Sequence, residues 1–346
     1  MLSRNPIFIT FIIAMLALAN GCKGSDGGTG SPGSPSQPQN PQTPNGPGNL
    51  PVDEKWDVNA KDAGAVEMSR RLQKYHSPHG LVYSAGYTEP GGSQLWRWDG
   101  VADSAIWTGT HLAAQGFWYR VTRSEEALTG MRRTVEAIRI ISQINGDGVL
   151  ARHFYPLNDP QLFAYLNDNS DLVNIQKKTF EGQEYYYLTR TSRDQYAGIY
   201  FGLGVAYDMV DDVELKNKIR AIVTSLTDYL LKTGWFTFNP DGSIRTTFVQ
   251  MPQQQLSILQ VARHVNPAKF AAEYEKLRST SATKTWLPMF IEGMSKTLSY
   301  YKFNLNHEYM YNLMRLEEKN SPFMGEYKKH GRHSQTALKG TKTRIS

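Results

Sequence analysis

Two stretches of the chain are apolar on every side when they are wound as helices. One covers residues 103–121 and the other residues 193–209, and each follows a long polar loop. Each has an aspartate at its start, Asp103 and Asp194, with small residues around a leucine nine positions later. A helix that is hydrophobic all round is a buried helix. The pattern therefore predicts two inner helices that begin at the same rim of the fold.

Apolar positions recur with the helical period in much of the chain from residue 60 onward. Ser124 is a predicted helix start, and Asn145-Gly146 is a predicted helix stop. One short strand is expected at residues 185–188, where three tyrosines precede a leucine. The other predicted helices, which make the expected fold class all-α, cover residues 60–75, 125–144, 213–232, 252–264, 268–278, 285–301 and 304–317.

Short and long connections alternate along the chain. Long loops enter the apolar helices, at residues 76–102, 146–192 and 234–251. Short links leave them, at residues 122–124, 211–212 and 266–267. Antiparallel hairpins with this alternation place every long loop at one end of the molecule. Hairpins that cannot each bury a face alone must stack, so we predict an α/α toroid with apolar inner helices and amphipathic outer helices.

This arrangement resembles the six-hairpin glycosidase-like superfamily. The resemblance is carried by two junctions between a loop and an inner helix, residues 99–103 (Asp-Gly-Val-Ala-Asp) and 192–195 (Ser-Arg-Asp-Gln). It covers about residues 55–320 and implies an α/α barrel that processes carbohydrate in a funnel at one end. The chain holds four or five predicted hairpins instead of six. Either the toroid is incomplete, or its natural C-terminus has been replaced or truncated.

The first residues of the chain resemble the leader of a bacterial lipoprotein. Residues 5–19 form an apolar run that is too short for a comfortable membrane span. Residues 19–22 (Ala-Asn-Gly-Cys) resemble a lipobox, which implies a signal peptide at 1–21 and lipidation of Cys22. An ordinary secretory signal is the alternative. By analogy with enteric sorting rules, Lys23 after the cysteine favours the outer membrane.

Composition divides the rest of the chain into three parts. Residues 22–52 are rich in Gly, Ser, Pro, Gln and Asn, and predict a disordered tether. The toroid domain is expected at 53–322 and a basic, disordered tail at 323–346. Within this tail, residues 324–346 hold six Lys or Arg and one Glu, so they supply +5 of the net charge of +6. The folded part is nearly neutral, which argues against nucleic acid as a partner.

Asp103 and Asp194 are the candidate catalytic pair, because they occupy equivalent places at one predicted rim. Glycoside hydrolysis needs two carboxyl groups that flank one bond, one of them acting as general acid. Asp99 is the reserve residue for substrate binding or catalysis. The alternative is helix capping, since an aspartate at a helix start accepts hydrogen bonds from free backbone N–H groups.

Aromatic and basic residues of the rim are the candidate sugar contacts. Trp96 and Trp98 flank an arginine in a predicted loop with no helix face to fill, so we expect them to stack on sugar rings. Trp107, Tyr200 and His111 lie within apolar helices and are predicted to be core residues. The planar guanidinium group of arginine can form two parallel hydrogen bonds with a carboxylate. The residues expected to bind an acidic sugar, or to pair with a nearby aspartate, are Arg97, Arg152, His153, Arg193 and His307.

No metal or cofactor is expected from the sequence. Residues 167–171 resemble the start of a calcium loop, but Leu172 stands where glycine is needed and Lys178 where glutamate is needed. Because Cys22 is the only cysteine, an internal disulfide and a thiolate metal cluster are excluded. The zinc-dependent lanthionine-cyclase branch of α/α toroids is excluded for the same reason.

These patterns predict a lipid-anchored protein of the bacterial cell envelope whose toroid binds an oligosaccharide or polysaccharide. If the rim carboxylates form a catalytic pair, the same site hydrolyses its ligand. The alternative is a non-catalytic lipoprotein with a binding or structural role in the envelope. Two carboxylates that face each other across an open cleft would favour the enzyme.

Overall fold

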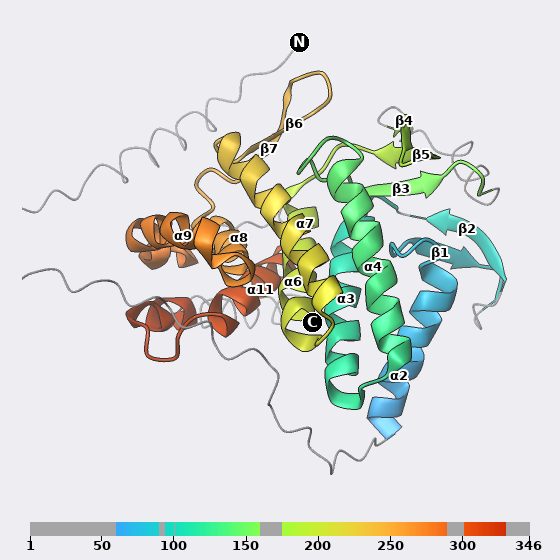
Figure 1. Ribbon diagram of the computed structural model, residues 1–346, viewed down its shortest axis with the longest axis horizontal. Coiled ribbons are helices and arrows are strands. Elements are labelled where there is room, and N and C mark those ends of the chain that lie inside the picture. The colour runs from blue at the N-terminus through green and yellow to red at the C-terminus, as the bar shows by residue number, and fades with distance from the viewer. Residues whose placement is uncertain (1–59, 90–93, 100, 160–174, 289–300, 330–346) are drawn as a thin grey trace, which may run out of the picture. The chain divides into compact units, whose positions relative to one another are not determined.

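The computed structural model describes residues 60–89, 94–99, 101–159, 175–288 and 301–329 (Figure 1). The predicted signal peptide, Cys22 and the tether lie outside this part of the chain, as do residues 330–346 of the expected tail. Among the described residues, no helix has the length and apolar character that a membrane span requires.

Two buried helices that touch along their backbones form the centre of the fold. They are α3 (Ser104–Thr122) and α6 (Arg193–Met209). A Cβ atom added to Gly109 would lie 1.9 Å from the carbonyl oxygen of Gly198, and one added to Gly202 would lie 2.2 Å from that of Gly109. Only glycine permits so close an approach. The two predicted inner helices are therefore confirmed as buried elements, and their glycines explain why they pack together.

The remaining helices begin and end close to the predicted positions. Ser124 accepts a hydrogen bond from the Ala127 backbone and caps the helix that follows α3, as expected. Asp212 accepts one from the Leu215 backbone in the same way at the start of α7. The helices around the central pair are α2 (Ala60–Arg71), which continues into the π-helix η2 (Leu72–His76), α4 (Glu125–Gln143), α7 (Val213–Lys232), α8 (Pro252–Val265), α9 (Pro267–Ser281) and α11 (Tyr301–Arg315).

Packing joins these helices into consecutive hairpins. α4 follows α3, α7 follows α6, and α9 follows α8, and within the first and last of these pairs the two helices are in extensive contact. α7 packs against both α4 and α8, while α11 packs against both α6 and α8. The chain is therefore mostly helical, in agreement with the all-α prediction. The closed ring of hairpins that defines a toroid stays a prediction.

Short antiparallel sheets occupy the long loops. The pairs are β1 (Ser84–Tyr87) with β2 (Leu95–Asp99), and β6 (Phe236–Phe238) with β7 (Ile244–Thr247). The third sheet has the order β3-β5-β4, from β3 (His153–Pro156), β4 (Ile175–Phe180) and β5 (Gln183–Leu188). Of these strands, only β5 overlaps a predicted strand. The other strands are short or, like β4, mostly polar, so they do not stand out from a polar loop.

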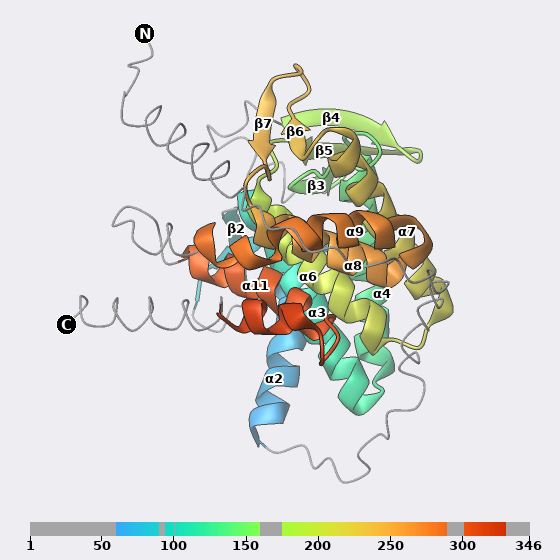
Figure 2. The same ribbon diagram turned by 90° about the vertical axis from the view of Figure 1, so that its left-hand side faces the viewer.

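The described parts of the long loops meet at one end of the helices, as the alternation of links predicted. The hydroxyl group of Tyr83, in the first loop, donates to the carbonyl of Phe154, in the second, at 2.7 Å. Arg245 in the third loop donates to the carbonyl of Thr191 in the second at 3.1 Å. Figure 2 shows β3, β4 and β5 beside β6 and β7 above the helices.

The fold continues beyond the boundary expected at residue 322. Residues 322–329 are helical, and the side chain of Tyr327 is completely buried. Its hydroxyl lies 3.4 Å from that of Tyr274 on α9, and Phe323 packs against the same cluster. Two aromatic residues four positions apart thus bind this charged segment to the core, so the expected boundary is too early.

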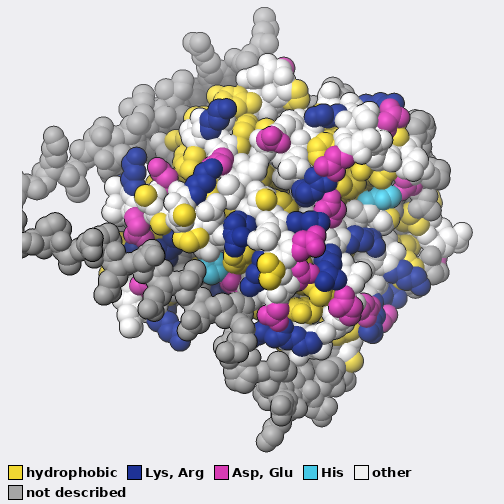
Figure 3. Space-filling model, in the orientation of Figure 1, with side chains coloured by type: hydrophobic (Ala, Val, Ile, Leu, Met, Phe, Trp, Pro, Cys, Tyr) yellow, Lys and Arg dark blue, Asp and Glu magenta, His cyan; other side chains and the backbone are white. Residues whose placement is uncertain are grey.

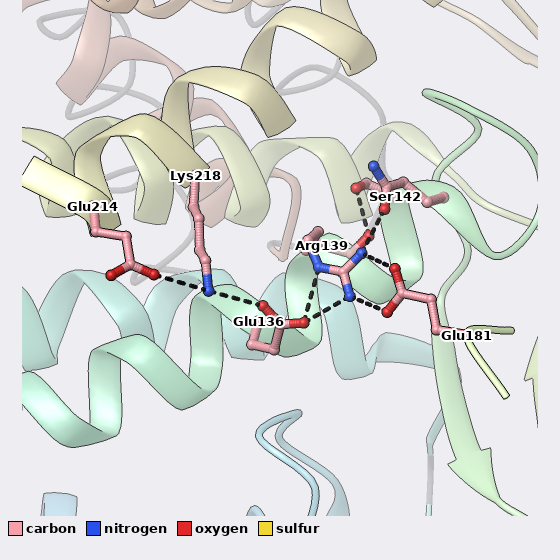
Figure 4. Close-up of polar contacts among 7 residues, drawn as sticks. Glu136, Arg139, Ser142, Glu181, Glu214 and Lys218 are labelled. Carbon is pink, nitrogen blue, oxygen red and sulfur yellow. Dashed lines mark hydrogen bonds and ion pairs between the residues drawn. The ribbon is translucent and has the colours of Figure 1, made fainter. Parts of the chain in front are cut away.

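Ion pairs cover the outer face of α4 and α7, where acidic and basic side chains lie side by side (Figure 3). Arg139 on α4 binds Glu136 at 2.8 Å and Glu181, in the turn between β4 and β5, at 2.5 Å (Figure 4). Lys218 on α7 lies 3.5 Å from the same Glu136. Exposed pairs of this kind contribute at most about 1 kcal/mol each, so they align these elements more than they stabilise them.

Candidate functional site

Asp103 lies at the start of α3 and joins three elements of the rim. Its Oδ1 atom accepts a hydrogen bond from the Nε2 of Gln195 at 3.1 Å and lies 3.4 Å from a guanidinium nitrogen of Arg152. The same nitrogen donates to the carbonyl of Ala102 at 2.7 Å. The pairing of Arg152 with a nearby aspartate, foreseen as one alternative, is thereby confirmed.

The helix-capping interpretation is wrong for Asp103. This residue occupies the N-cap position of α3, but its side chain makes no capping hydrogen bond. Its φ of −103° and ψ of 18° differ from the extended backbone that lets a cap side chain turn back onto its own helix. The carboxylate is directed across to α6 and to the loop before β3 instead.

Asp194 lies in the first turn of α6, next to the Gln195 that binds Asp103. The helix begins after Ser192, whose side chain makes no capping hydrogen bond. The negative charge of Asp194 acts on Glu308 and raises the pKa of that carboxyl group. The starts of α3 and α6 thus come together as predicted, but the carboxyl group coupled to Asp194 is one that sequence reasoning did not select.

Glu308 on α11 is a buried carboxyl group, with only 6% of the residue exposed. Its Oε1 accepts hydrogen bonds from Thr110 of α3 at 3.1 Å and from Asn304 of its own helix at 3.3 Å. Its Oε2 has no hydrogen-bond partner within the part of the chain that the structure describes. Burial raises the pKa of Glu308 from 4.5 to about 7, and the charge of Asp194 adds to this rise.

Burial therefore keeps a proton on Glu308 up to nearly neutral pH, which is what a general acid requires. No local pattern in the sequence predicts the burial of Glu308. In the predicted helix 304–317, a glutamate beside His307 has the pattern of a solvated polar face. The distinguishing signal, a polar partner on α3, lies 198 positions away in the chain.

Three exposed aromatic side chains lie on α3 and α11, the two helices that the hydrogen bond between Thr110 and Glu308 joins. Trp107 and Phe117 on α3 are 36% and 37% exposed, and Tyr311 on α11 is 39% exposed. Trp107 is three positions from Thr110, and Tyr311 is three positions from Glu308, so each shares a helix face with one member of that hydrogen bond.

Phe201 of α6 is partly buried and packs edge-to-face against Tyr311, with ring centroids 5.4 Å apart. We call Trp107, Phe117, Phe201 and Tyr311 the aromatic face. The prediction that Trp107 is a core residue is wrong, because this side chain is partly exposed on α3. Tyr200 is completely buried, as predicted, and its hydroxyl lies 2.8 Å from that of Thr227.

The predicted Trp-Arg-Trp loop is a strand. Residues 95–99 form β2, in which Trp98 lies opposite Ala85 of β1 and Asp99 lies opposite Ser84. Trp96 is 62% exposed, which is compatible with the expected contact to a ligand. The side chains of Arg97, Trp98 and Asp99 lie outside the described part of the structure.

The other predicted contacts fall in different environments. His153 is buried in β3 with its ring 4.8 Å from that of Tyr155, so it belongs to the core and not to an accessible rim. Arg193 is the first residue of α6, and its carbonyl accepts a hydrogen bond from Tyr309 at 2.8 Å. His307 is exposed on α11, next to Glu308. Reasoning from the sequence alone could not tell which of these side chains reach solvent.

His111 is buried in α3, as predicted for a core histidine. Its Nε2 lies 3.2 Å from the hydroxyl of Ser69 on α2. Burial, together with the smaller effect of the charge of Arg133, lowers the pKa of His111 to about 4. This histidine therefore stays neutral at physiological pH and packs between helices.

The described residues contain no cluster of His, Cys, Asp and Glu that could hold a metal ion. The calcium-like residues 167–171 lie outside them. Comparison of the chain with family models, with curated proteins and with solved structures gives no match in any of the three. The function must therefore be argued from the site itself.

Proposed function

We propose that this protein binds an oligosaccharide over the aromatic face of α3, α6 and α11. The observation that carries the proposal is the exposure of Trp107, Phe117 and Tyr311 on α3 and α11, the two helices that also hold the buried carboxyl group of Glu308 and its partner Thr110. Large exposed aromatic side chains that gather on one face indicate a binding surface. Sugar rings present apolar C–H faces that pack on such side chains.

Polar groups between the aromatic rings favour a carbohydrate over a protein partner. Thr110, Asn304 and His307 supply hydroxyl, amide and imidazole groups on the same helix faces, and Asp194 adds a carboxylate. The cores of protein–protein interfaces are depleted of charged residues. A ligand that is rich in hydroxyl groups can hydrogen-bond to these side chains while its ring faces cover the aromatic ones.

A second candidate function, glycoside hydrolysis, is favoured by the coupling of Glu308 to Asp194. One carboxyl group of such a pair must hold its proton as general acid, and the other must act as nucleophile or base. Glu308 fits the first role and Asp194 the second. In this pair Glu308 replaces Asp103, because Arg152 and Gln195 already occupy the carboxylate of Asp103.

The setting we propose for this site is a protein tethered to the bacterial cell envelope through a lipid on Cys22, with an incomplete α/α toroid as scaffold. The support for the anchor is the lipobox-like sequence before Cys22. The support for the toroid is the series of hairpins with their long loops at one end. A tether of about 30 residues would let such a domain reach ligands beyond the membrane surface.

Binding is tested with the full chain on a panel of immobilised neutral and acidic oligosaccharides. Trp107→Ala and Tyr311→Ala should each weaken binding by about tenfold or more, because each removes a stacking surface. Met68→Ala is the matched control, since Met68 is exposed on α2, a helix that contributes no residue to the aromatic face. Binding that both aromatic variants retain in full would overturn the proposal.

Hydrolysis is tested on any oligosaccharide that binds, by assaying new reducing ends. Asp194→Asn and Glu308→Gln should abolish turnover while binding persists. If the wild-type protein binds the ligand but never releases a reducing end, the protein is a binding protein and the hydrolase candidate fails.

A further inference from the structure

Three arginines from two segments of the chain gather at the start of α6. Arg190 follows strand β5, Arg193 is the first residue of α6, and Arg245 belongs to β7. We call them the arginine cluster. The carbonyl of Thr191 accepts a hydrogen bond from the Nε of Arg245 at 3.1 Å, which holds β7 against the link that carries the other two arginines. Burial lowers the pKa of Arg245, and the nearby positive charge of Arg190 adds to this effect.

The arginine cluster borders the carboxyl pair of the proposed site. Arg193 directly precedes Asp194 in the first turn of α6. The carbonyl of Arg193 accepts a hydrogen bond from the hydroxyl of Tyr309 at 2.8 Å, and Tyr309 follows Glu308 on α11. An oligosaccharide that contacts Asp194 and Glu308 therefore lies next to the start of α6, where the arginines gather.

The absence of carboxylate partners distinguishes this cluster from other arginines of the fold. Arg70, Arg139 and Arg278 each pair with a glutamate, at 2.9, 2.5 and 2.7 Å. Across the described ranges, no carboxylate lies within ion-pair distance of any of the three clustered arginines. Positive charges that lie close together without counter-charges favour the binding of an anion.

The terminal nitrogens of Arg245 are accessible to a ligand. Its Nε atom is occupied by the carbonyl of Thr191. Its two Nη atoms bind no acceptor among the residues that the structure describes, and they are not enclosed by the protein. Two N–H groups of one guanidinium can bind both oxygens of a carboxylate. Arg193 is partly exposed and Arg190 is exposed, so their charges also reach solvent.

The aspartates of this region do not offset the cluster fully. The carboxylate of Asp103 is already bound by two side chains. Asp241 lies in the turn before β7, where its Oδ1 accepts a hydrogen bond from the hydroxyl of Ser243 at 2.6 Å. The charge of Arg190 reaches Asp241, but the two form no ion pair. With Asp194, two aspartates thus stand against three arginines, which leaves an excess of positive charge beside the site.

We propose that the ligand site selects acidic oligosaccharides, and that the arginine cluster binds the carboxylate of a uronic acid unit. This inference rests on the proposed binding of an oligosaccharide over the aromatic face, and it names the class of sugar. Arg245 binds both carboxylate oxygens through its Nη atoms, while Arg190 and Arg193 supply further positive charge. The sequence alone gives no reason to select Arg245, because it comes from a separate loop.

The experiment measures binding of short oligomers of galacturonate, glucuronate and mannuronate to the full chain by calorimetry. The methyl ester of each oligomer is the ligand control, since it keeps the sugar rings and removes the negative charge. At least one acid should bind about tenfold or more tightly than its ester, and added salt should weaken its binding.

The outcomes separate this inference from the proposed function. If the esters or neutral oligosaccharides bind, Trp107→Ala weakens that binding, and no acid binds more tightly than its ester, the selection of acidic sugars is wrong while the proposed function stands. If no oligosaccharide binds, acidic or neutral, both proposals are wrong.

Two variants locate the carboxylate. Arg245→Gln should weaken binding of the acid by about tenfold or more and leave the affinity for its ester unchanged, because it removes the guanidinium group. Arg190→Gln should act in the same direction, and this exposed side chain can be replaced without loss of a described hydrogen bond. Arg70→Gln is the matched control, since α2 contributes no residue to the cluster. Affinity for the acid that is equal in wild type and in both cluster variants would overturn the proposal.

Discussion

Replacing Glu308 with glutamine tests whether this buried carboxyl group keeps its proton up to neutral pH. Glutamine has nearly the same shape, and its carbonyl oxygen can accept the hydrogen bonds that Thr110 and Asn304 now donate. It cannot titrate. The difference in stability between the two proteins therefore isolates the protonation of one group.

The expected magnitude follows from the pKa of Glu308, which burial raises from 4.5 to about 7. Because the folded state binds this proton more tightly than the unfolded chain, the group loses stability as the pH rises through this window. Each pKa unit corresponds to about 1.4 kcal/mol. Ionisation of Glu308 should thus cost about 3 kcal/mol at pH values above 7, a cost that is absent below pH 4.5.

The assay is urea unfolding of wild type and Glu308→Gln at a series of pH values on both sides of this window. Other titrating groups are common to both proteins, so their contributions cancel in the difference. Relative to wild type, the variant should gain about 3 kcal/mol between the acidic and the alkaline end of the series. Glu273→Gln, which changes an exposed glutamate on α9, is the control for a generic loss of charge.

A flat difference would refute the reasoning. If the stability difference between Glu308→Gln and wild type changes by less than about 0.5 kcal/mol over the series, Glu308 ionises like an exposed carboxyl group. The role of general acid would then lose its physical basis, and the coupling to Asp194 would have no functional meaning.

Three further changes test the fold and the anchor. Gly109→Ala should lower the free energy of unfolding by about 3 kcal/mol, because its Cβ would lie 1.9 Å from the carbonyl of Gly198. Gly64→Ala, whose Cβ would meet nothing within 4 Å, should raise it by about 0.5 to 1 kcal/mol; equal effects in urea unfolding would contradict the close helix crossing. Asp212→Ala should cost about 1 kcal/mol through loss of the N-cap of α7, and Asp212→Asn, which keeps the cap, should restore most of it. Cys22→Ser should prevent incorporation of labelled fatty acid and release the protein from membranes; membrane association that persists without acylation would exclude the lipid anchor.

Much of the fold could be predicted from the sequence because helices are encoded locally. The bounds of α6 and α7 match the predicted residues 193–209 and 213–232, since the apolar pattern of each helix is complete within its own segment. The small residues around Leu112 and Leu203 are also visible in the sequence, and the glycines among them are what let α3 and α6 approach closely. The alternation of short and long connections placed the loops at one end, because a short link allows only an antiparallel return.

The candidate site depended on contacts that no local pattern contains. Trp107 lies on a helix whose sequence is apolar all round, yet it is exposed because no described helix covers that side of α3. Asp103 has the sequence signature of a cap, but Gln195 and Arg152, from two distant segments, hold its carboxylate. The sequence around Glu308 is typical of a surface position, but the packing of α11 against α6 and its contact with Thr110 of α3 leave Glu308 buried. A residue's secondary structure follows from its neighbours in the chain, whereas its exposure and pKa follow from whichever segments pack against it. Only the tertiary structure decides the exposure and the pKa of these residues.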